Sequence, residues 1–255
     1  MSKKRKEQAA VLSNREISAG IYDIWLRTNE IAGFALPGQF VSLYCADGSR
    51  LLPRPISICE IDVDENRIRL VYRVAGKGTE EFSKLAPGQQ IEIAGPLGNG
   101  FPKKPGSSFL IGGGIGIPPM LELAKQLEGE KQIVLGFRDA QFLVEDFKKY
   151  GQVSIATEDG SAGTKGNVLD AIRGQGLKAD RIYACGPLPM LRALKEYAAN
   201  NGMECYVSLE ERMACGIGAC LGCVCKSKET DAHTNVKNKR ICKEGPVFEA
   251  GEVEF

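Results

Sequence analysis

Four cysteines lie within eleven residues near the end of this 255-residue chain, and they constrain the fold more than any other feature. The run is Cys215-Gly-Ile-Gly-Ala-Cys220-Leu-Gly-Cys223-Val-Cys225, and Cys242 follows it. The total of nine is odd and bunched at one end, which is not the pattern of a disulfide framework. The basic opening Met1–Lys6 precedes no apolar stretch, so we interpret it as a solvated tail and not an export signal. These cysteines therefore indicate metal binding in a reducing cytoplasm.

The spacing of the cysteines indicates which metal centre they bind. Cys215, Cys220 and Cys223 follow the C-x4-C-x2-C pattern of plant-type [2Fe–2S] clusters, which need one more distant cysteine. The glycines between them permit the tight turns of a loop that wraps a cluster. Five candidates compete for four places. We assign Cys242 as the fourth ligand, because Cys225 falls outside the spacing.

Two other kinds of metal centre also use cysteine ligands, and the single histidine of the chain excludes the second of them. A structural zinc site can also use four thiolates, which would make the chain a non-catalytic, zinc-stapled interaction module, but such sites usually show paired C-x2-C knuckles. A Rieske centre needs two histidines, and the chain has only His233, which we expect in a solvated loop.

Hydrophobic patterning divides the chain into three segments, 1–104, 105–209 and 210–255. The first predicts an antiparallel β-barrel with one brief helix at Glu80–Leu85. Its expected strands are Ile17–Arg27, Gln39–Cys45, Ile56–Asp62, Ile68–Val74 and Gln90–Ala94. The third segment has too few large apolar residues to build a core alone, so we expect a bound metal centre to support it.

The second segment alternates strands and helices, which predicts a parallel sheet covered on both faces. The expected strands are Phe109–Ile111, Lys131–Gly136, Gln152–Thr157, Arg181–Ala184 and Met203–Leu209. The expected helices are Met120–Leu127, Phe142–Tyr150, Asn167–Arg173 and Pro189–Asn200. The fold class is therefore α+β and multi-domain.

Two glycine-rich turns in this segment follow strands and precede helices. They are Gly112-Gly-Gly-Ile-Gly116 and Cys185-Gly-Pro-Leu-Pro-Met190. Such turns bring backbone N–H groups toward a pyrophosphate. Because the carboxyl ends of parallel strands share one edge, the two turns predict a nucleotide-binding crevice. Each turn alone is a weak signal, since a tight turn can exist without a ligand.

The barrel carries two further motifs, Arg54-Pro-Ile-Ser57 and Gly76-Lys-Gly-Thr79, with Val71-Tyr-Arg73 on the strand between them. An arginine can bind a phosphate through its planar fork, and the glycine turn can offer N–H groups. Ordinary barrel surface is the alternative interpretation of these residues.

In this order the motifs resemble the ferredoxin-NADP reductase superfamily. The stretches Leu209–Cys220 and Cys242–Phe248 resemble the electron-transfer subunits of dihydroorotate dehydrogenase B, and the likeness extends over nearly the whole chain. The resemblance implies FAD, NAD and a [2Fe–2S] cluster as cofactors. It implies that Ser57 and Cys185 lie near the flavin N5 and the nicotinamide. Ile56 stands where some relatives carry an aromatic residue, so we expect no ring stacking there.

The implied FAD-binding residues are Arg54, Pro55, Ile56, Ser57, Val71, Tyr72, Arg73, Gly78 and Thr79. The implied nucleotide-binding residues are Gly112, Gly113, Gly114, Ile115, Gly116, Cys185, Gly186 and Pro187. The implied cluster ligands are Cys215, Cys220, Cys223 and Cys242.

Glu158 and Asp159 follow the third strand of the nucleotide segment. We expect them to accept hydrogen bonds from ribose hydroxyls and to repel a 2′-phosphate, which favours NAD over NADP.

The resemblance also implies a reaction and a partner. A catalytic subunit with FMN would oxidise dihydroorotate to orotate, and this chain would pass the electrons to NAD+, with two copies of each chain forming a heterotetramer. The related subunits of sulfide dehydrogenase and of NADH-dependent ferredoxin:NADP oxidoreductase are the alternative. A balance of 33 basic and 32 acidic residues gives no reason to expect nucleic acid or a membrane as partner.

Overall fold

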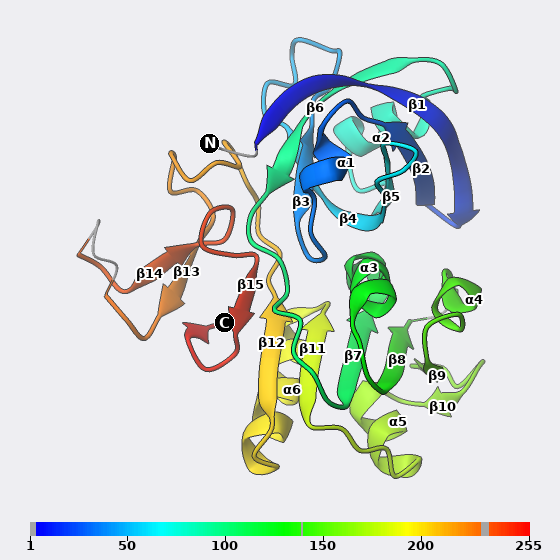
Figure 1. Ribbon diagram of the computed structural model, residues 1–255, viewed down its shortest axis with the longest axis vertical. Helices are drawn as coiled ribbons and strands as arrows, with labels where there is room; N and C mark the ends of the chain where they lie inside the picture. The colour runs from blue at the N-terminus through cyan, green and yellow to red at the C-terminus, as the bar shows by residue number, and fades with distance from the viewer. Residues whose placement is uncertain (1–3, 139, 231–234) are drawn as a thin grey trace.

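Six antiparallel strands close into a barrel in the computed structural model, which describes residues 4–138, 140–230 and 235–255 (Figure 1). The strand order around the barrel is β1-β2-β5-β4-β3-β6. The strands are β1 (Arg5–Ser18), β2 (Ile21–Arg27), β3 (Phe40–Leu43), β4 (Arg54–Asp62), β5 (Arg67–Arg73) and β6 (Gln90–Leu97). The short helices α1 (Ile31–Phe34) and α2 (Lys77–Ser83) complete this domain. Helix α2 overlaps the predicted helix Glu80–Leu85, whereas α1 was not predicted. The predicted antiparallel barrel is confirmed.

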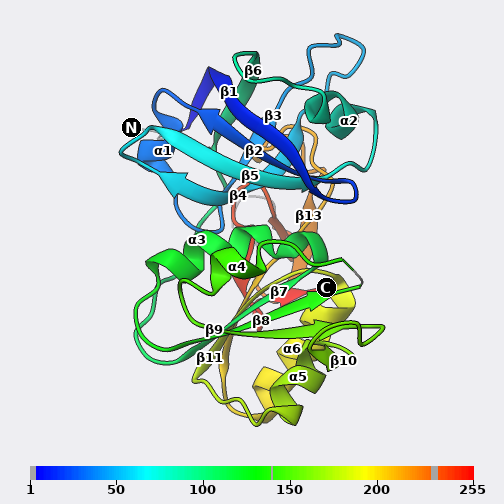
Figure 2. The same cartoon turned by 90° about the vertical axis from the view of Figure 1, so that its right-hand side faces the viewer.

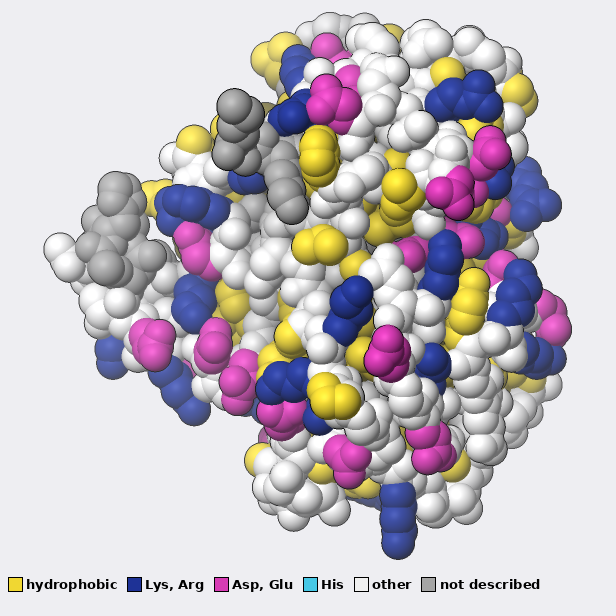
Figure 3. All heavy atoms as spheres, in the orientation of Figure 1, with side chains coloured by type: hydrophobic (Ala, Val, Ile, Leu, Met, Phe, Trp, Pro, Cys, Tyr) yellow, Lys and Arg dark blue, Asp and Glu magenta, His cyan; other side chains and the backbone are white. Residues whose placement is uncertain are grey.

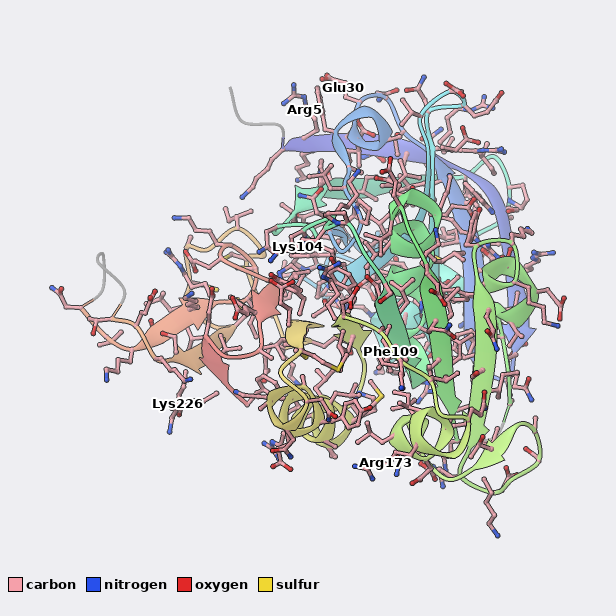
Figure 4. The ribbon with its side chains drawn as sticks, turned by 60° about the horizontal axis from the view of Figure 1, so that its bottom comes forward. Arg5, Glu30, Lys104, Phe109, Arg173 and Lys226 are labelled. Atoms are coloured by element: carbon pink, nitrogen blue, oxygen red, sulfur yellow. The ribbon has the colours of Figure 1, made fainter. Side chains whose placement is uncertain are left out.

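The beginning of the barrel corrects two predictions. The basic opening is not a solvated tail from Arg5 onward, because Arg5–Ala10 pairs with β6. Arg5 also forms a 2.7 Å ion pair with Glu30 (Figure 4). The expected strand Ile17–Arg27 is in fact the end of β1, a turn and the whole of β2. Gly20 makes that turn with φ +69°, a conformation that glycine adopts without strain.

A seven-stranded sheet forms the second domain, in the order β10-β9-β8-β7-β11-β12-β15. Its strands are β7 (Ser108–Gly113), β8 (Lys131–Phe137), β9 (Gln152–Thr157), β10 (Thr164–Lys165), β11 (Arg181–Cys185), β12 (Glu204–Ser208) and β15 (Val247–Glu249). The helices are α3 (Pro118–Gln126), α4 (Val144–Phe147), α5 (Val168–Gly174) and α6 (Leu188–Asn200), with a single 3₁₀ turn at Gly114–Gly116.

Helices cover both faces of this sheet, as Figure 2 shows. The strand residues alternate between the two faces, so Leu110 packs in the core under α3 and α4, whereas Phe109 and Ile111 pack in the core with α5 and α6. The predicted parallel sheet is therefore confirmed. Helix α4 is shorter than the predicted Phe142–Tyr150, because Leu143 adopts a left-handed conformation with φ 62° directly before it.

The third segment is not a separate layer. Its strands β13 (Val224–Ser227), β14 (Asn238–Arg240) and β16 (Val253–Glu254) form a small sheet, but β15 adds antiparallel to β12 at the edge of the large sheet (Figure 1). Cys223, Cys242 and Phe248 share one apolar core with Val207. The segment thus uses the core of its neighbour, a source of stability that was not predicted beside the expected metal centre. The domain boundaries near residues 104 and 209 stay predictions.

A buried carboxylate joins the barrel to the second domain. Glu122 on α3 is 1% exposed, and its Oε2 accepts a 2.7 Å hydrogen bond from the Ile61 backbone N–H on β4. Lys125 Nζ donates to the Ile61 carbonyl at 2.8 Å, and Arg69 Nη1 lies 3.3 Å from Asp146 Oδ1 on α4. The bonds to Ile61 hold α3 against β4, and the pair of Arg69 with Asp146 joins β5 to α4, so the two domains are fixed against each other.

The outer surface carries no single-sign field on the face drawn in Figure 3, where basic and acidic side chains are intermixed. Within the described part of the chain, none of the helices has both the length and the apolar character needed to cross a bilayer.

Candidate functional site

A cavity of about 830 Å³ lies beside the barrel motifs. Every predicted flavin-binding residue except Gly78 lines it, namely Arg54, Pro55, Ile56, Ser57, Val71, Tyr72, Arg73 and Thr79. The register of the strands brings them together, since Ser57 pairs with Phe40 on β3 and Tyr72 stacks on Tyr22 of β2 at 6.0 Å. Volume and lining suit an elongated aromatic cofactor with charged phosphates.

Gly78 supports this cavity from behind. A Cβ atom on Gly78 would lie only 2.2 Å from Arg54 Nε, so glycine is needed for the guanidinium to lie against this turn. The Thr79 hydroxyl accepts hydrogen bonds from the Ala75 and Gly76 N–H groups at 2.9 and 3.2 Å. The turn is thereby shaped into a fixed cradle beside Arg54, an arrangement that fits a phosphate group.

A second cavity of about 620 Å³ opens at the carboxyl edge of the parallel sheet. Of the predicted nucleotide-binding residues it is lined by Gly113, Gly114, Ile115, Gly116, Gly186, Pro187 and Glu158. Gly112 is buried below the first turn, where a Cβ would lie 2.8 Å from Ile117 Cα. Asp159 does not line the cavity, and its carboxylate accepts a 3.0 Å hydrogen bond from the Ser161 N–H.

The two glycine turns are in direct contact. A Cβ atom on Gly116 would lie 2.5 Å from the Cys185 carbonyl, and one on Gly186 would lie 3.1 Å from Gly113 Cα. Only glycine lets the two backbones approach so closely. Because the turns carry no side chains at these positions, their peptide groups face the cavity and are accessible to a ligand. Cys185 itself is fully buried and lines neither cavity, and burial raises the pKa of its thiol well above the ordinary value.

Three residues line both cavities, namely Arg73, Ile115 and Glu210. Glu210 directly follows β12, and no motif singled it out in the sequence. Its side chain is exposed to solvent within the crevice. Many protein atoms from the crevice walls nevertheless surround the carboxyl group. Burial therefore raises the pKa of this carboxyl, and the positive charge of Arg73 opposes the rise. The shared wall is where ligands in the two cavities would meet.

Sequence reasoning also missed Arg138 and Asn167, which line the second cavity. Arg138 directly follows β8, so its position at a carboxyl end was the available signal. In the first cavity it missed Phe40, Arg212, Met213 and Pro246, which come from other parts of the chain and share no local pattern.

The four predicted cluster cysteines gather in two pairs. The thiols of Cys215 and Cys220 lie within hydrogen-bonding reach of each other, and so do those of Cys223 and Cys242. Cys215 is also close enough to Cys242 to affect its pKa. A [2Fe–2S] cluster takes two protein ligands on each of its two irons, so this arrangement fits its donor set.

Backbone geometry prepares the first pair for metal binding. Burial raises the pKa of the Cys215 thiol, but N–H groups of Ile217, Cys220 and Ala219 outweigh it and lower the pKa to about 6. The Ala219 N–H lies 3.3 Å from Cys215 Sγ. Thiolates are the metal-binding form, so these N–H groups favour ligation.

Burial and the nearby Cys223 raise the pKa of Cys242 to about 12. Bound iron would reverse this effect, because a coordinated thiol is deprotonated.

Arg240 holds in place the loop of residues 215–223, which carries three of the predicted cluster ligands and is called the cluster loop below. Its Nη1 donates to the Gly218 carbonyl at 3.0 Å, while its Nε donates to Glu244 Oε2 at 3.0 Å. Gly216 and Gly218 have φ values of +66° and +88°, which confirms the need for glycine in this loop.

Cys225 lies apart from these pairs. It is half-buried on β13, and its Sγ donates to the Lys239 carbonyl at 3.6 Å. Among the described residues, no group of three or more Cys, His, Asp or Glu side chains is close enough together to hold a single metal ion. The predicted loop position of His233 lies outside the described residues.

Apolar side chains connect the cysteines with the lining of the first cavity. Phe40 lines that cavity and shares one core with Cys223 and Cys242, while Met213 lines it and packs against the same core. One continuous apolar core therefore extends from the cysteines to the lining of the cavity.

Comparisons with known proteins agree with this geometry. Residues 210–254 match the family described as the iron-sulfur cluster binding domain of dihydroorotate dehydrogenase B. The chain is 45% identical over 258 residues to the dihydroorotate dehydrogenase B (NAD(+)) electron transfer subunit of Bacillus caldolyticus, covering 97% of this chain and 98% of that one. The protein of the same name from Fusobacterium nucleatum is 43% identical over 263 residues, covering 98% of each.

Two solved structures share the fold. An NADH-dependent reduced ferredoxin-NADP oxidoreductase, studied for flavin-based electron bifurcation, has a TM-score of 0.87 at 28% identity over 96% of this chain and 89% of that chain. The ferredoxin reductase of carbazole 1,9a-dioxygenase has a TM-score of 0.65 at 21% identity, covering 78% of this chain and 67% of that one.

Proposed function

The chain belongs to the family of dihydroorotate dehydrogenase B electron transfer subunits, and from this premise we propose how its residues serve electron transfer to NAD+ in pyrimidine biosynthesis. It has an iron-sulfur cluster domain and the fold of reductases that bind FAD and NAD. The proposed donor is a catalytic subunit with FMN that oxidises dihydroorotate to orotate. When bound, the cluster supplies one-electron transfer and FAD supplies the change to the two-electron hydride chemistry of NAD+.

The observation that carries this proposal is the arrangement of the two cavities and the thiol pairs. The cavities share Arg73, Ile115 and Glu210, so a flavin in one and a nicotinamide in the other would be neighbours. Cys223 and Cys242 share an apolar core with Phe40, which lines the flavin cavity. This order suits a chain that collects single electrons on one side and delivers a pair on the other.

In the flavin cavity, Arg54 and the turn at Gly78 and Thr79 would hold the pyrophosphate of FAD. Ser57 would lie at the ring, where its hydroxyl makes no hydrogen bond with another described residue and so can serve the cofactor. Val71 and Tyr72 would pack against the isoalloxazine or its ribityl chain, since both are buried on β5 and line the cavity.

At the shared wall, Arg73 and Glu210 would orient the two rings. The raised pKa of Glu210 lets this carboxyl hold a proton at higher pH than an ordinary glutamate does. In the nucleotide cavity the glycine turns would form the floor, and Glu158 would accept hydrogen bonds from the adenosine ribose.

At the cluster, Cys215 and Cys220 would bind one iron, and Cys223 and Cys242 the other. Arg240 would keep the loop in shape through its bond to Gly218. Phe40 and Met213 would exclude water between cluster and flavin, which keeps this region at low dielectric.

The surface around the cysteines supports a protein partner. Ile217, Leu221 and Val224 are 53%, 46% and 40% exposed, although each is apolar, and all three lie in or next to the cluster loop. We propose that they contact the catalytic subunit in a heterotetramer with two copies of each chain. Nine free cysteines support a reducing cytoplasm as the location. The 45% identity favours this family over the ferredoxin:NADP oxidoreductase alternative at 28%.

The test uses the purified chain with FAD, iron and sulfide confirmed by spectrum and chemical analysis. It should oxidise NADH with an artificial dye but should not form orotate, because both cavities are assigned to FAD and nicotinamide nucleotide. Adding the catalytic subunit should restore dihydroorotate-dependent reduction of NAD+. Orotate formation by this chain alone, or a colourless zinc-containing protein, would contradict the proposal.

A further inference from the structure

Four neighbouring strands end along one edge of the nucleotide cavity. In the sheet the order is β9-β8-β7-β11, and all four run parallel. The residues after them line the cavity in the same order, with Glu158 after β9, Arg138 after β8, Gly114 after β7 and Gly186 after β11. Adjacent strands are about 4.8 Å apart, so this row spans about 14 Å.

The ends of this row are chemically different. Ile115, next to Gly114, also lines the flavin cavity, so the β7 and β11 end is where a nicotinamide can meet the flavin. The β9 end carries Glu158, which suits ribose hydroxyls. A dinucleotide stretched along the row therefore has its nicotinamide over β7 and β11 and its adenosine over β9. Its diphosphate, in the middle of the molecule, then lies over β8 and the adjoining end of β7, between Arg138 and the Gly112–Gly116 turn.

Arg138 is the residue at that position. Its side chain is exposed, and it forms no ion pair with any other residue in the described part of the chain. Gly136, two residues earlier on β8, lines the cavity as well, and a Cβ there would lie 2.8 Å from Val168 Cγ1. Glycine at this position lets Val168 pack directly against the strand, where any larger residue would collide with it. The cationic side chain of Arg138 then stands at the end of the strand, and a guanidinium binds phosphate oxygens in a bidentate manner.

We infer that Arg138 binds the diphosphate of NAD(H) and sets the direction in which the dinucleotide lies along the sheet edge. This inference rests on the proposed function, since it takes NAD(H) as the ligand of this cavity. Arg73 is the other cation in the cavity, but it belongs to the wall shared with the flavin. The two arginines therefore serve different parts of the ligand.

The experiment compares ligands that differ in phosphate content on the chain loaded with FAD and cluster. ADP-ribose carries the diphosphate without a nicotinamide, and dihydronicotinamide riboside carries a nicotinamide without phosphate. In Arg138→Ala, affinity for ADP-ribose and NADH should fall about 10- to 100-fold, as expected for hydrogen bonds to a charged group. The rate of flavin reduction by dihydronicotinamide riboside should stay that of the wild type. Arg138→Lys should recover part of the ADP-ribose affinity, because it keeps the charge without the fork.

Arg27→Ala is the matched control, since Arg27 is an exposed arginine on β2 that lines neither cavity. This variant should have the wild-type affinity for ADP-ribose and NADH and the wild-type rate of flavin reduction by dihydronicotinamide riboside. Unchanged ADP-ribose affinity in Arg138→Ala would overturn the inference, and so would an equal loss with dihydronicotinamide riboside. If the wild-type chain binds NADH and reduces a dye, either result leaves the proposed function standing. Failure of the wild-type chain to bind NADH would instead contradict the proposed function itself.

Discussion

Replacing Glu122 by alanine should loosen the contact between the barrel and the nucleotide domain. The carboxylate accepts hydrogen bonds from the Ile61 N–H at 2.7 Å and from Gln126 Nε2 at 2.6 Å. Lys125 Nζ lies 3.7 Å from it. Ile61 is only 4% exposed. Alanine at position 122 would therefore leave the buried Ile61 N–H without a hydrogen-bond acceptor. The contact that holds α3 to β4 would therefore lose its central acceptor.

Two effects set the size of the change. An unsatisfied buried N–H group costs about 1–3 kcal/mol. Removing a buried carboxylate gives part of this back, because burial raises the pKa of Glu122 and so disfavours its charged form. We expect a net loss of about 2 kcal/mol, which lowers the melting temperature of a chain of this size by about 4–8 °C.

The pH dependence separates the charge from the hydrogen bond. Glu122→Gln keeps an oxygen acceptor for Ile61 but cannot ionise. Because the folded pKa of Glu122 is raised, its contribution to stability is fully present below the ordinary pKa of 4.5 and is lost as the pH rises through the folded pKa. Burial is the main cause, the charge of Glu60 adds to it, and Gln126, Ile61 and Lys125 oppose it. The wild type should therefore lose stability relative to Glu122→Gln as the pH rises.

The assay is thermal unfolding of the chain with FAD and cluster bound, from acid to neutral pH. Glu145→Ala serves as the control, because Glu145 is also acidic and lies in the same domain, but its side chain is 81% exposed and pairs only with Lys148. It should change the melting temperature little. The reasoning is wrong if Glu122→Ala and Glu145→Ala have the same melting temperature. It is also wrong if the difference in melting temperature between the wild type and Glu122→Gln does not change with pH.

Three further predictions concern the cofactor and substrate sites. Cys225→Ser should keep the cluster whereas Cys220→Ser should lose it, and iron and sulfide analysis showing the reverse would mean a different set of four ligands. Glu158 should repel the 2′-phosphate of NADPH by about 1–2 kcal/mol, which gives NADH roughly a tenfold or greater advantage in kcat/KM with a dye as acceptor. Glu158→Gln should reduce this advantage. Equal kcat/KM values of the wild type for NADH and NADPH would contradict the idea. Glu210→Gln should flatten the pH dependence of NADH binding above pH 4.5, since the wild-type carboxyl ionises there with a raised pKa, and identical profiles would exclude that role.

Much of the nucleotide domain could be predicted because its strands are buried on both faces. Gln152–Thr157 was predicted with the bounds that the structure has, and Arg181–Ala184 was one residue short. Strand β1 was missed because its exposed Lys6 and Gln8 give it the composition of a tail. Its pairing with β6, about eighty residues later, decides that it is a strand.

The candidate site divides in the same way. The motifs at Arg54–Ser57 and Gly112–Gly116 could be found in the sequence, because each is a turn or strand end whose conformation depends on its own residues, and both lie beside cavities. Glu210 and Arg138 belong to no motif, and only their places at the ends of β12 and β8 bring them into the crevice. Cys185 belongs to a motif, yet its thiol lies beneath the turn, since the two glycine turns pack over it.

By itself the sequence determined the chemistry of each local segment. The spacing of Cys215, Cys220 and Cys223 defines a cluster loop, because the three residues are close along the chain and the glycines between them allow one tight turn. The tertiary structure decided which distant residues complete each site. It brought Cys242 to Cys223, packed Phe40 of the first cavity into the same core as these cysteines, and joined the two cavities at Glu210. The physical reason is that such contacts depend on how whole domains pack, and that packing is a property of two cores and their interface and not of any short stretch of chain.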